Sequence, residues 1–325
     1  MIFDLFGGPL NNGKKELTDV SVYQGYTDFV IEAEALGFHG IFLVEHHFSG
    51  VKQTTATIEY LSYLAARTTT IRLGTGVIAI PWHNPVLLAE QIATLDVLSN
   101  GRVDFGVGKG YRPYEFKGFN IPIEESFSRF EEGLEVIRKA LNSSGSFSHD
   151  GNFWKFTDVF VEPTPVQKPI PMWNGAVVEK TIRYAAQNEF NLLLDQHADL
   201  STHAENICTY KSTLASDKKN FSPENVGIAR ALYISLNNAE RDKYLDRHVA
   251  FMKTVSKHRG ENNTRTNEEL RHEAEKIVLI GDSEEIIQKI YKIKEIGCER
   301  LLLVVPDNSI DHLHVFSEKI MPEFT

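Results

Sequence analysis

The chain has 325 residues, and its 34 Lys and Arg against 44 Asp and Glu give a net charge of −10 at pH 7. A hydrophobic fraction of 42% and a charged fraction of 24% are ordinary for a soluble globular protein and exclude extensive disorder. The negative charge argues against nucleic acid and against an anionic membrane as the main partner.

Cysteine usage and the N-terminal residues indicate the compartment. The two cysteines, Cys208 and Cys298, are far apart and form no CxxC pair, so we expect no disulfide framework and a reducing compartment. The first residues, MIFDLFGGPLNNGKK, lack the basic and then apolar pattern of a signal peptide. The sequence has no apolar run of the roughly 18 residues that a membrane span needs. We therefore expect a soluble, cytoplasmic protein.

Short apolar runs recur along the chain, and most are continuously apolar, as strands covered by helices on both faces are. The predicted strands are Ile2–Phe6, Ile41–Glu45, Ile71–Ile78, Val103–Val107, Ile170–Asn174, Asn191–Leu194, Val226–Ile234 and Leu301–Val305.

Helix-period segments separate these runs. Apolar residues between positions 22 and 36 follow i, i+3, i+4 spacing and stop at Gly37. Asn84 and Pro85 are typical of an N-cap and first helical position, ahead of a helix that reaches Leu98. A third helix is predicted around residues 130–141.

The alternation of about eight strands with helices predicts a (β/α)8 TIM barrel, as a single domain over residues 1–325. The alternative is a doubly wound open sheet. That fold usually carries GxGxxG after its first strand, and here the first strand runs into Gly7-Gly8-Pro9. The barrel is favoured.

Two stretches interrupt the alternation. Residues 146–161 place Asp150-Gly151 between alternating aromatic residues, which predicts an inserted β-hairpin. Residues 242–276 are polar and highly charged, and they are too long for a routine connection. They predict either a mobile lid or a solvated helical hairpin.

In barrel enzymes the active site lies at the C-terminal ends of the strands. The predicted strand ends carry Glu45-His46-His47, Gly108-Lys109-Gly110, Asn174-Gly175-Ala176 and Asp195-Gln196-His197. Histidine, lysine and small residues gather there, which indicates a ligand-binding mouth.

The His46-His47 pair can be interpreted in two ways. Consecutive strand residues point to opposite faces, so the pair cannot hold one metal ion, and no ligand cluster completes such a site. His46 is then either a packing residue or a base or hydrogen-bond partner that works near neutral pH. Its position beside Glu45, just beyond a strand, favours the catalytic role.

Other candidates also have structural alternatives. Gly108-Lys109-Gly110 offers amides and one ammonium, which suit a phosphate. Arg129 is either a second phosphate cation or a helix residue that pairs with Glu125 or Glu132. Trp82 and Trp173 are either core residues or walls for a planar ligand.

Several segments together resemble a known family. The segments LGFHGIFLVEHHFSG, IRLGTGVIAIPWHNPVLLAEQIATLDVLSNGRVDFGVGKGY and SFSRFEEGLEVI resemble the bacterial luciferase-like flavin monooxygenases. The later segments NGAVVEKTIRYAAQ and VLIGDSEEIIQKI are similar to the same family. The resemblance covers nearly the whole chain and keeps its order.

The resemblance implies a (β/α)8 barrel that uses reduced FMN from a separate NAD(P)H-dependent flavin reductase. It further implies O2 addition to give a C4a-(hydro)peroxyflavin, which oxygenates a small organic substrate such as an aldehyde, a ketone or a similar apolar compound. The catalytic residue is then His46, and the Gly76-Val77 peptide is cis beneath the flavin ring. A homodimer is implied, with an interface near Ile58–Ala66 and Leu87–Leu98.

The same resemblance assigns the remaining site residues. The cofactor-binding residues are Thr75, Gly76, Val77, Lys109, Gly110, Tyr111, Arg129, Ala176, Val177, Val178 and Thr181. The substrate-pocket residues are Phe6, Trp82, Trp173 and Gln196.

Three departures from the light-emitting α subunit bear on the substrate. Gly108 stands in place of its reactive cysteine, Lys109 in place of an arginine, and Gln196 in place of a tryptophan. Flavin binding remains expected, whereas light emission from a long-chain aldehyde does not. The alternatives are a deazaflavin-dependent oxidoreductase on the same fold, a non-catalytic flavin-binding subunit and, least favoured, a metal-dependent hydrolase.

Overall fold

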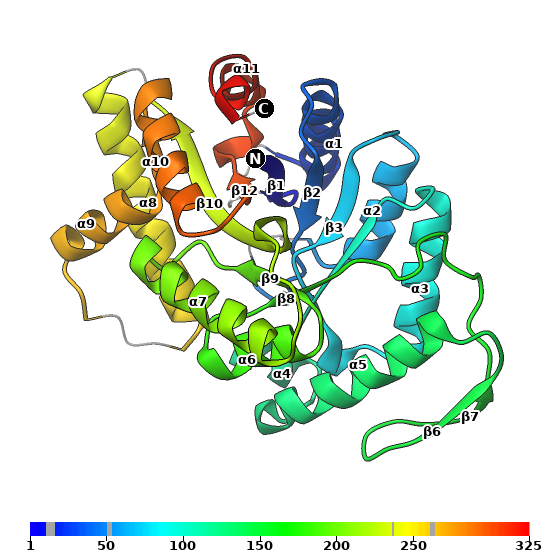
Figure 1. Ribbon diagram of the computed structural model, residues 1–325. Helices are drawn as coiled ribbons and strands as arrows, with labels where there is room; N and C mark the ends of the chain where they lie inside the picture. Colours follow the sequence, from blue (N-terminus) through cyan, green and yellow to red (C-terminus); the bar gives the residue numbers. More distant parts are fainter. Residues whose placement is uncertain (11–16, 51–53, 236, 261–263, 325) are drawn as a thin grey trace. The chain divides into compact units, whose positions relative to one another are not determined.

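The computed structural model describes residues 1–10, 17–50, 54–235, 237–260 and 264–324, drawn in Figure 1. The chain folds into two compact units. Unit 1 comprises Met1–Phe6, Asp28–Gly40 and Asn174–Thr325, and unit 2 comprises Gly7–Thr27 and Ile41–Trp173. Over the described ranges, no helix combines the length and apolar character that a bilayer crossing requires.

The strands alternate with helices along the chain. The strands are β1 (Ile2–Gly7), β2 (Gly40–Leu43), β3 (Arg72–Thr75), β4 (Ile78–Ala79), β5 (Val103–Gly108), β6 (Phe147–Asp150), β7 (Lys155–Val159), β8 (Met172–Gly175), β9 (Asn191–Leu194), β10 (Val226–Ile234), β11 (Leu279–Gly281) and β12 (Arg300–Val304).

Helices follow most of the strands. They are α1 (Asp19–Ala35), α2 (Thr57–Ala65), α3 (Pro85–Leu98), α4 (Pro113–Gly118), α5 (Ser126–Asn142), α6 (Glu179–Gln187), α7 (Leu200–Ser216), α8 (Asn238–His258), α9 (Asn267–Ile277), α10 (Ser283–Glu295) and α11 (Ile310–Lys319). Short 3-10 turns are η1 (Ile80–Trp82), η2 (Ile123–Glu125), η3 (Pro223–Asn225), η4 (Pro306–Asn308) and η5 (Met321–Phe324). The alternation and the strand order are those of a (β/α)8 barrel, which confirms the predicted fold class.

In unit 1, β10 is the central strand. It pairs in parallel with β9, β11 and β12, and β12 pairs in parallel with β1. The buried carboxylate of Asp4 on β1 accepts a hydrogen bond of 2.9 Å from Arg300 on β12 and lies 3.0 Å from Nδ1 of His39. These partners satisfy a carboxylate that burial would otherwise penalise.

In unit 2, the predicted strand Ile71–Ile78 is two strands. β3 pairs in parallel with β5 through Leu73 and Val103, and β4 pairs with the same strand through Ile78 and Val107. Between them the Gly76-Val77 peptide is cis, as the resemblance implied. The ladder breaks there, so the prediction of one continuous strand was wrong.

A close backbone approach joins β3 to β5. A Cβ atom at Gly106 would lie 1.8 Å from the carbonyl oxygen of Thr75, so only glycine fits. The buried hydroxyl of Thr75 donates to the Gly106 carbonyl at 2.7 Å and accepts from the Gly106 amide at 2.8 Å. Both hydrogen-bonding functions of this hydroxyl are therefore used within the sheet.

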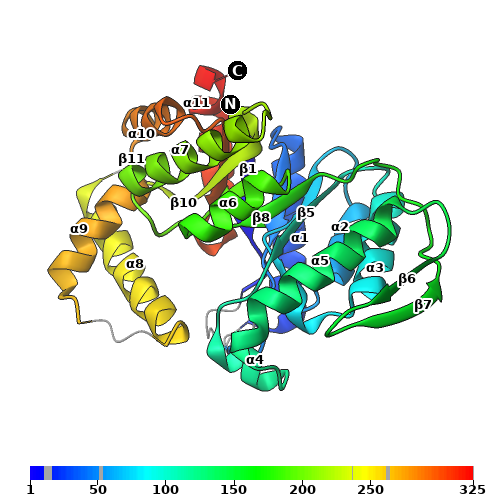
Figure 2. The ribbon, with the colours of Figure 1, turned by 60° about the horizontal axis from the view of Figure 1, so that its bottom comes forward.

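Both predicted insertions have regular structure. Residues 146–161 contain the antiparallel pair β6 and β7, which lies beside α5 in Figure 1 and confirms the predicted hairpin. Within residues 242–276, α8 and α9 pack side by side, as Figure 2 shows, and residues 261–263 lie outside the described part of the chain. Of the two alternatives for this stretch, the structure has the helical hairpin. Its inner face buries Leu245, Val249 and Leu270.

Candidate functional site

The two adjacent histidines after β2 have different carboxylate partners. Nδ1 of His46 lies 3.2 Å from Oε1 of Glu115, whereas Nε2 of His47 lies 3.1 Å from Oε1 of Glu45. The side chain of His46 is 16% exposed. Each ring therefore has a carboxylate of its own.

Glu115 comes from α4, the short helix that follows β5. The helix begins at Pro113, a residue preferred at the first helical position. Oε1 of Glu115 also accepts from the backbone N–H of His47 at 2.9 Å, and Nη1 of Arg112 lies 3.8 Å away from the same oxygen. This carboxylate was not predicted from the sequence, although its position a few residues after the strand that ends before Lys109 was a usable signal.

Burial lowers the pKa of His46 below its ordinary 6.5. The hydrogen bond to Glu115 and the charges of Glu115 and Glu45 oppose this shift, and the charge of Arg112 adds to it. The net effect keeps the imidazole neutral at pH 7, so it can accept a proton or a hydrogen bond.

Glu45 is the second buried carboxylate of the site. Its Oε1 lies 3.1 Å from Nε2 of His47 and 2.7 Å from Nε2 of His83, and its Oε2 accepts from the Ala79 amide at 2.8 Å. Burial raises the pKa of Glu45, but these three hydrogen bonds outweigh it and lower the pKa to about 2. Glu45 thereby ties the end of β2 to the segment that follows the cis peptide.

An aromatic cluster lies beside the histidines in unit 2. Trp82 stacks on Phe119 at a centroid distance of 5.0 Å, and Phe116 meets Trp82 edge-on at 5.4 Å. His47 meets Phe119 edge-on at 4.8 Å, and exposed Phe48 packs on Phe119 at 4.9 Å. Trp82 therefore belongs to an aromatic cluster beside His47, and its role as a pocket wall stays a prediction.

Trp173, in contrast, is a core residue of unit 2. It is fully buried, its indole N–H donates to Asp104 at 3.1 Å, and its ring meets Phe42 edge-on at 5.6 Å. These contacts use its one donor and surround its ring. They argue against the substrate-pocket role that the resemblance gave it.

The residues after β5 are Lys109, Gly110 and Tyr111, for which phosphate binding stays a prediction. Lys109 has no ion-pair partner among the described residues. Gly110 has a φ of +73°, and a Cβ there would lie 3.0 Å from both Trp82 and Phe116. Tyr111 is 45% exposed, and its hydroxyl accepts from Nε of Arg112 at 3.2 Å. The backbone at Gly110, the residue after Lys109, therefore lies against the aromatic cluster.

Arg129 forms one of the two ion pairs that its position in the sequence allowed. Its Nε donates to Oε2 of Glu125 at 2.8 Å, and its guanidinium lies 4.5 Å from the centroid of Phe153. A cation that is already paired is a weaker phosphate ligand than Lys109.

The remaining predicted residues belong to unit 1. Ala176 is buried, and Val177 and Val178 are exposed just before α6. The hydroxyl of Thr181 donates to the Val178 carbonyl at 2.9 Å. Unit 1 also contains Phe6 and Gln196, which are both half-buried. The buried Oε1 of Gln196 has no hydrogen-bond partner among the described residues.

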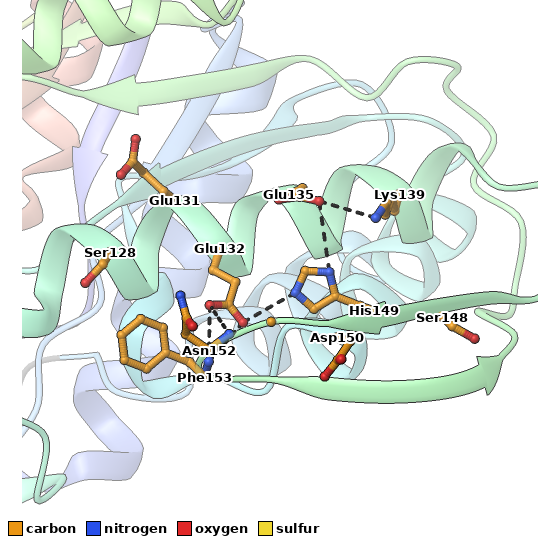
Figure 3. A pocket seen from close by; sticks show the side chains of 11 residues that line it. Ser128, Glu131, Glu132, Glu135, Lys139, Ser148, His149, Asp150, Asn152 and Phe153 are labelled. Atoms are coloured by element: carbon orange, nitrogen blue, oxygen red, sulfur yellow. Dashed lines mark hydrogen bonds and ion pairs between the residues drawn. The ribbon is translucent and has the colours of Figure 1, made fainter.

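A polar pocket elsewhere on unit 2 lies between α5 and the β6–β7 hairpin (Figure 3). Glu132 points into it and accepts from the amides of Asn152, Phe153 and Trp154 at 2.9–3.1 Å, and it lies 3.3 Å from Nε2 of His149. These contacts fasten the hairpin to the helix. Over the described residues, no three or more His, Cys, Asp or Glu side chains are arranged to hold a metal ion.

The family model described as luciferase-like monooxygenase matches residues 2–300. The chain belongs to this family. An uncharacterised protein of Sinorhizobium fredii, y4vJ, is 30% identical over 74% of this chain and 68% of its own length. The oxygenase component of the flavin-dependent trigonelline monooxygenase of Acinetobacter baylyi is 30% identical over 54% of this chain. The aligned part spans 49% of that relative's own length.

Solved structures of several enzymes share the fold of this chain. The monooxygenase RslO1 of Streptomyces bottropensis has a TM-score of 0.90 at 22% identity, with all of both chains covered. The oxygenating constituent of 3,6-diketocamphane monooxygenase of Pseudomonas putida, solved with FMN, has a TM-score of 0.81 at 15% identity, covering 100% of this chain and 99% of the other. An F420-dependent secondary alcohol dehydrogenase has a TM-score of 0.80 at 16% identity, covering 98% of each chain.

Proposed function

We propose that this chain is the oxygenase of a two-component flavin monooxygenase that uses reduced FMN and O2 to oxygenate a small organic substrate. The observation that carries the proposal is the placement of two groups in one compact unit: a neutral, carboxylate-bound His46, and Lys109, which has no ion pair among the described residues. Family membership agrees with it, because relatives named as flavin-dependent oxygenases match this chain.

The residues of unit 2 fit an FMN cofactor. The ammonium of Lys109 and the backbone around Gly110 would hold the phosphate, and the backbone of Gly76 and Val77 would leave room for the ring. When bound, the reduced flavin would supply the electrons for O2 activation. Nε2 of His46 would accept or return a proton in the site, and the rings of the Trp82 cluster would exclude water from it.

Two further parts of the proposal concern partners. A separate NAD(P)H-dependent reductase would supply reduced FMN, and the printed name of the trigonelline relative, an oxygenase component, supports this division of labour. The aromatic cluster of Trp82, Phe119 and Phe48 supports an apolar substrate, such as an aldehyde or a ketone.

We also propose a homodimer that uses α2 and α3. These neighbouring helices of unit 2 expose the large apolar side chains Tyr63, Leu87, Val97 and Leu98. An exposed apolar set of this kind marks an interaction surface. Light scattering at micromolar concentration should give twice the chain mass, and Leu98→Glu should shift it toward the monomer. A monomeric wild-type protein would contradict the dimer.

The experiment that tests the function begins with anaerobic titration of the protein with photoreduced FMN. The solution is then mixed with O2 while flavin absorbance is recorded. We expect tight binding and slower reoxidation than that of free reduced FMN, with the slowing lost in His46→Ala. Binding without slowing would favour a flavin carrier, and binding of reduced F420 instead of FMN would favour the deazaflavin alternative.

A further inference from the structure

Two adjacent histidines, His46 and His47, each contact a carboxylate, but through different ring nitrogens. The carboxylate of Glu115 lies at Nδ1 of His46, whereas the carboxylate of Glu45 lies at Nε2 of His47. A carboxylate accepts hydrogen bonds and donates none, so each contact determines which ring nitrogen carries the hydrogen.

We propose that Glu115 is a positioning residue that holds His46 as the Nδ1–H tautomer and leaves the lone pair of its Nε2 for proton transfer in the site. The use of that lone pair rests on the proposed function. The tautomer itself follows from the contacts of Glu115.

The geometry around Glu115 leaves little freedom for another arrangement. Its side chain is buried on α4, and Oε1 is oriented by the backbone N–H of His47 at 2.9 Å. The same oxygen faces Nδ1 of His46 at 3.2 Å, so this nitrogen must donate. A flip of the imidazole about its Cβ–Cγ bond would place the Cδ2–H group at this oxygen instead of Nδ1 and leave the carboxylate with one partner fewer.

Other charged and titratable groups also face His46. Arg112 lies 3.8 Å from Glu115 Oε1, and it donates from Nη1 to the Tyr114 hydroxyl at 2.8 Å and from Nε to the Tyr111 hydroxyl. The ring of Tyr111 meets His46 edge-on at 6.3 Å. Glu45 adds a more distant negative charge. Among the described residues, none of these groups contacts Nδ1 of His46 as a hydrogen-bond acceptor. Glu115 is the acceptor at that nitrogen.

The experiment is ¹⁵N NMR of the histidine rings in the full-length protein without flavin, at pH 7.5. His46→Gln assigns the His46 resonances. We expect the Nδ1–H tautomer for His46 and the Nε2–H tautomer for His47 in the wild type. Because no flavin is present, this result does not depend on flavin binding, and its failure is distinguishable from failure of the proposed function.

Two variants separate the hydrogen bond of Glu115 from its charge. Glu115→Gln keeps an acceptor oxygen, so His46 should remain the Nδ1–H tautomer while its pKa falls. Glu115→Ala removes the acceptor, so His46 should shift toward the Nε2–H form, while His47 is unchanged and serves as the internal reference. If Glu115→Ala does not fold, the tautomer of His46 in the wild type still tests the proposal.

The reoxidation of bound reduced FMN by O2, described under the proposed function, gives a second readout. Glu115→Ala should lose most of the slowing of reoxidation with little change in the affinity for reduced FMN, and Glu115→Gln should restore part of the slowing. Glu135→Gln, an exposed carboxylate on α5, is the matched control and should behave as wild type. An Nε2–H tautomer of His46 in the wild type, or an unchanged tautomer in Glu115→Ala, would overturn the proposal.

Discussion

The carboxylate Oε1 of Glu45 lies 2.7 Å from Nε2 of His83, 38 positions further along the chain. The same carboxylate accepts the Ala79 amide, so one buried side chain connects the end of β2 to the segment that follows the cis peptide. The geometry of this part of unit 2 therefore depends on an ionised Glu45.

This dependence predicts how stability varies with pH. The pKa of Glu45 is about 2 in the folded protein against an ordinary 4.5, so ionisation contributes about 3 kcal/mol. The contribution is complete above pH 5 and is lost as the pH falls toward 2. Urea unfolding should show that Glu45→Gln lowers the free energy of unfolding at pH 7 and flattens its fall between pH 5 and pH 3.

Glu135→Gln is the control for that series, because its exposed carboxylate pairs with the exposed Lys139 on the same helix, α5. It should change the free energy of unfolding by less than about 0.5 kcal/mol. If the free energy of unfolding varied with pH in the same way in the wild type and in Glu45→Gln, the contacts of Glu45 with His47 and His83 would not stabilise the fold.

The cations of the predicted phosphate site should differ in importance. Lys109 has no ion pair among the described residues, whereas Arg129 is paired with Glu125. Lys109→Met should weaken reduced FMN binding at least tenfold, because a charge-assisted contact is lost. Arg129→Met should weaken it less than threefold. Isothermal titration with reduced riboflavin, which lacks the phosphate, is the control and should show no effect of either change.

A reversed order, with Arg129→Met the more damaging change, would mean that the Glu125 pair opens when phosphate binds. An equal loss of riboflavin binding in Lys109→Met would mean that the lysine contacts the ring or supports the fold instead of holding the phosphate.

Gly110 should tolerate no side chain. Its φ of +73° disfavours any residue with a Cβ, and that atom would lie 3.0 Å from Trp82 and Phe116. Gly110→Ala should therefore lower the free energy of unfolding by about 2 kcal/mol and alter tryptophan fluorescence. Gly145→Ala is the matched control, because a Cβ at that position would meet nothing within 4 Å. An unchanged free energy of unfolding in Gly110→Ala would show that this loop relaxes to accommodate the methyl group.

The Glu132 contacts predict a local effect on the β6–β7 hairpin. Glu132→Ala removes the acceptor for the amides of Asn152, Phe153 and Trp154. Hydrogen exchange measured by mass spectrometry should rise several-fold in peptides from residues 146–161 and stay unchanged in β5. Glu131→Ala, one position earlier on the same helix, should leave the hairpin protected. Uniform exchange changes across the chain would contradict a local role.

Much of the architecture could be predicted from local patterns. The bounds of β9 and β10 agree with the predicted strands, because continuous apolar runs are a strong signal for buried strands. Asn84 caps α3 as predicted, and its side chain accepts from the amides of Val86 and Leu87. Such signals are local, since each depends on a few neighbouring residues.

The pairing of side chains could not be predicted in the same way. Glu115 and His46 are 69 positions apart, and nothing near either residue specifies the other. Arg129 had two acidic candidates within one helical turn, and the contact with Glu125 was decided by the three-dimensional arrangement. The residues around Trp173 in the sequence do not distinguish a core tryptophan from a pocket wall. The hydrogen bond of its indole to Asp104, which only the folded structure shows, makes that distinction.

The sequence by itself determined the barrel class, the order of its strands and helices, the hairpin insertion and the position of His46 beyond β2. These follow from hydrophobic periodicity and turn chemistry, which act over a few residues. The tertiary structure alone decided that Glu115 faces Nδ1 of His46, that Glu45 joins His47 to His83, and that Arg129 is paired with Glu125. Hydrogen bonds and ion pairs depend on distances of a few ångströms between atoms, and only folding brings distant parts of a chain that close.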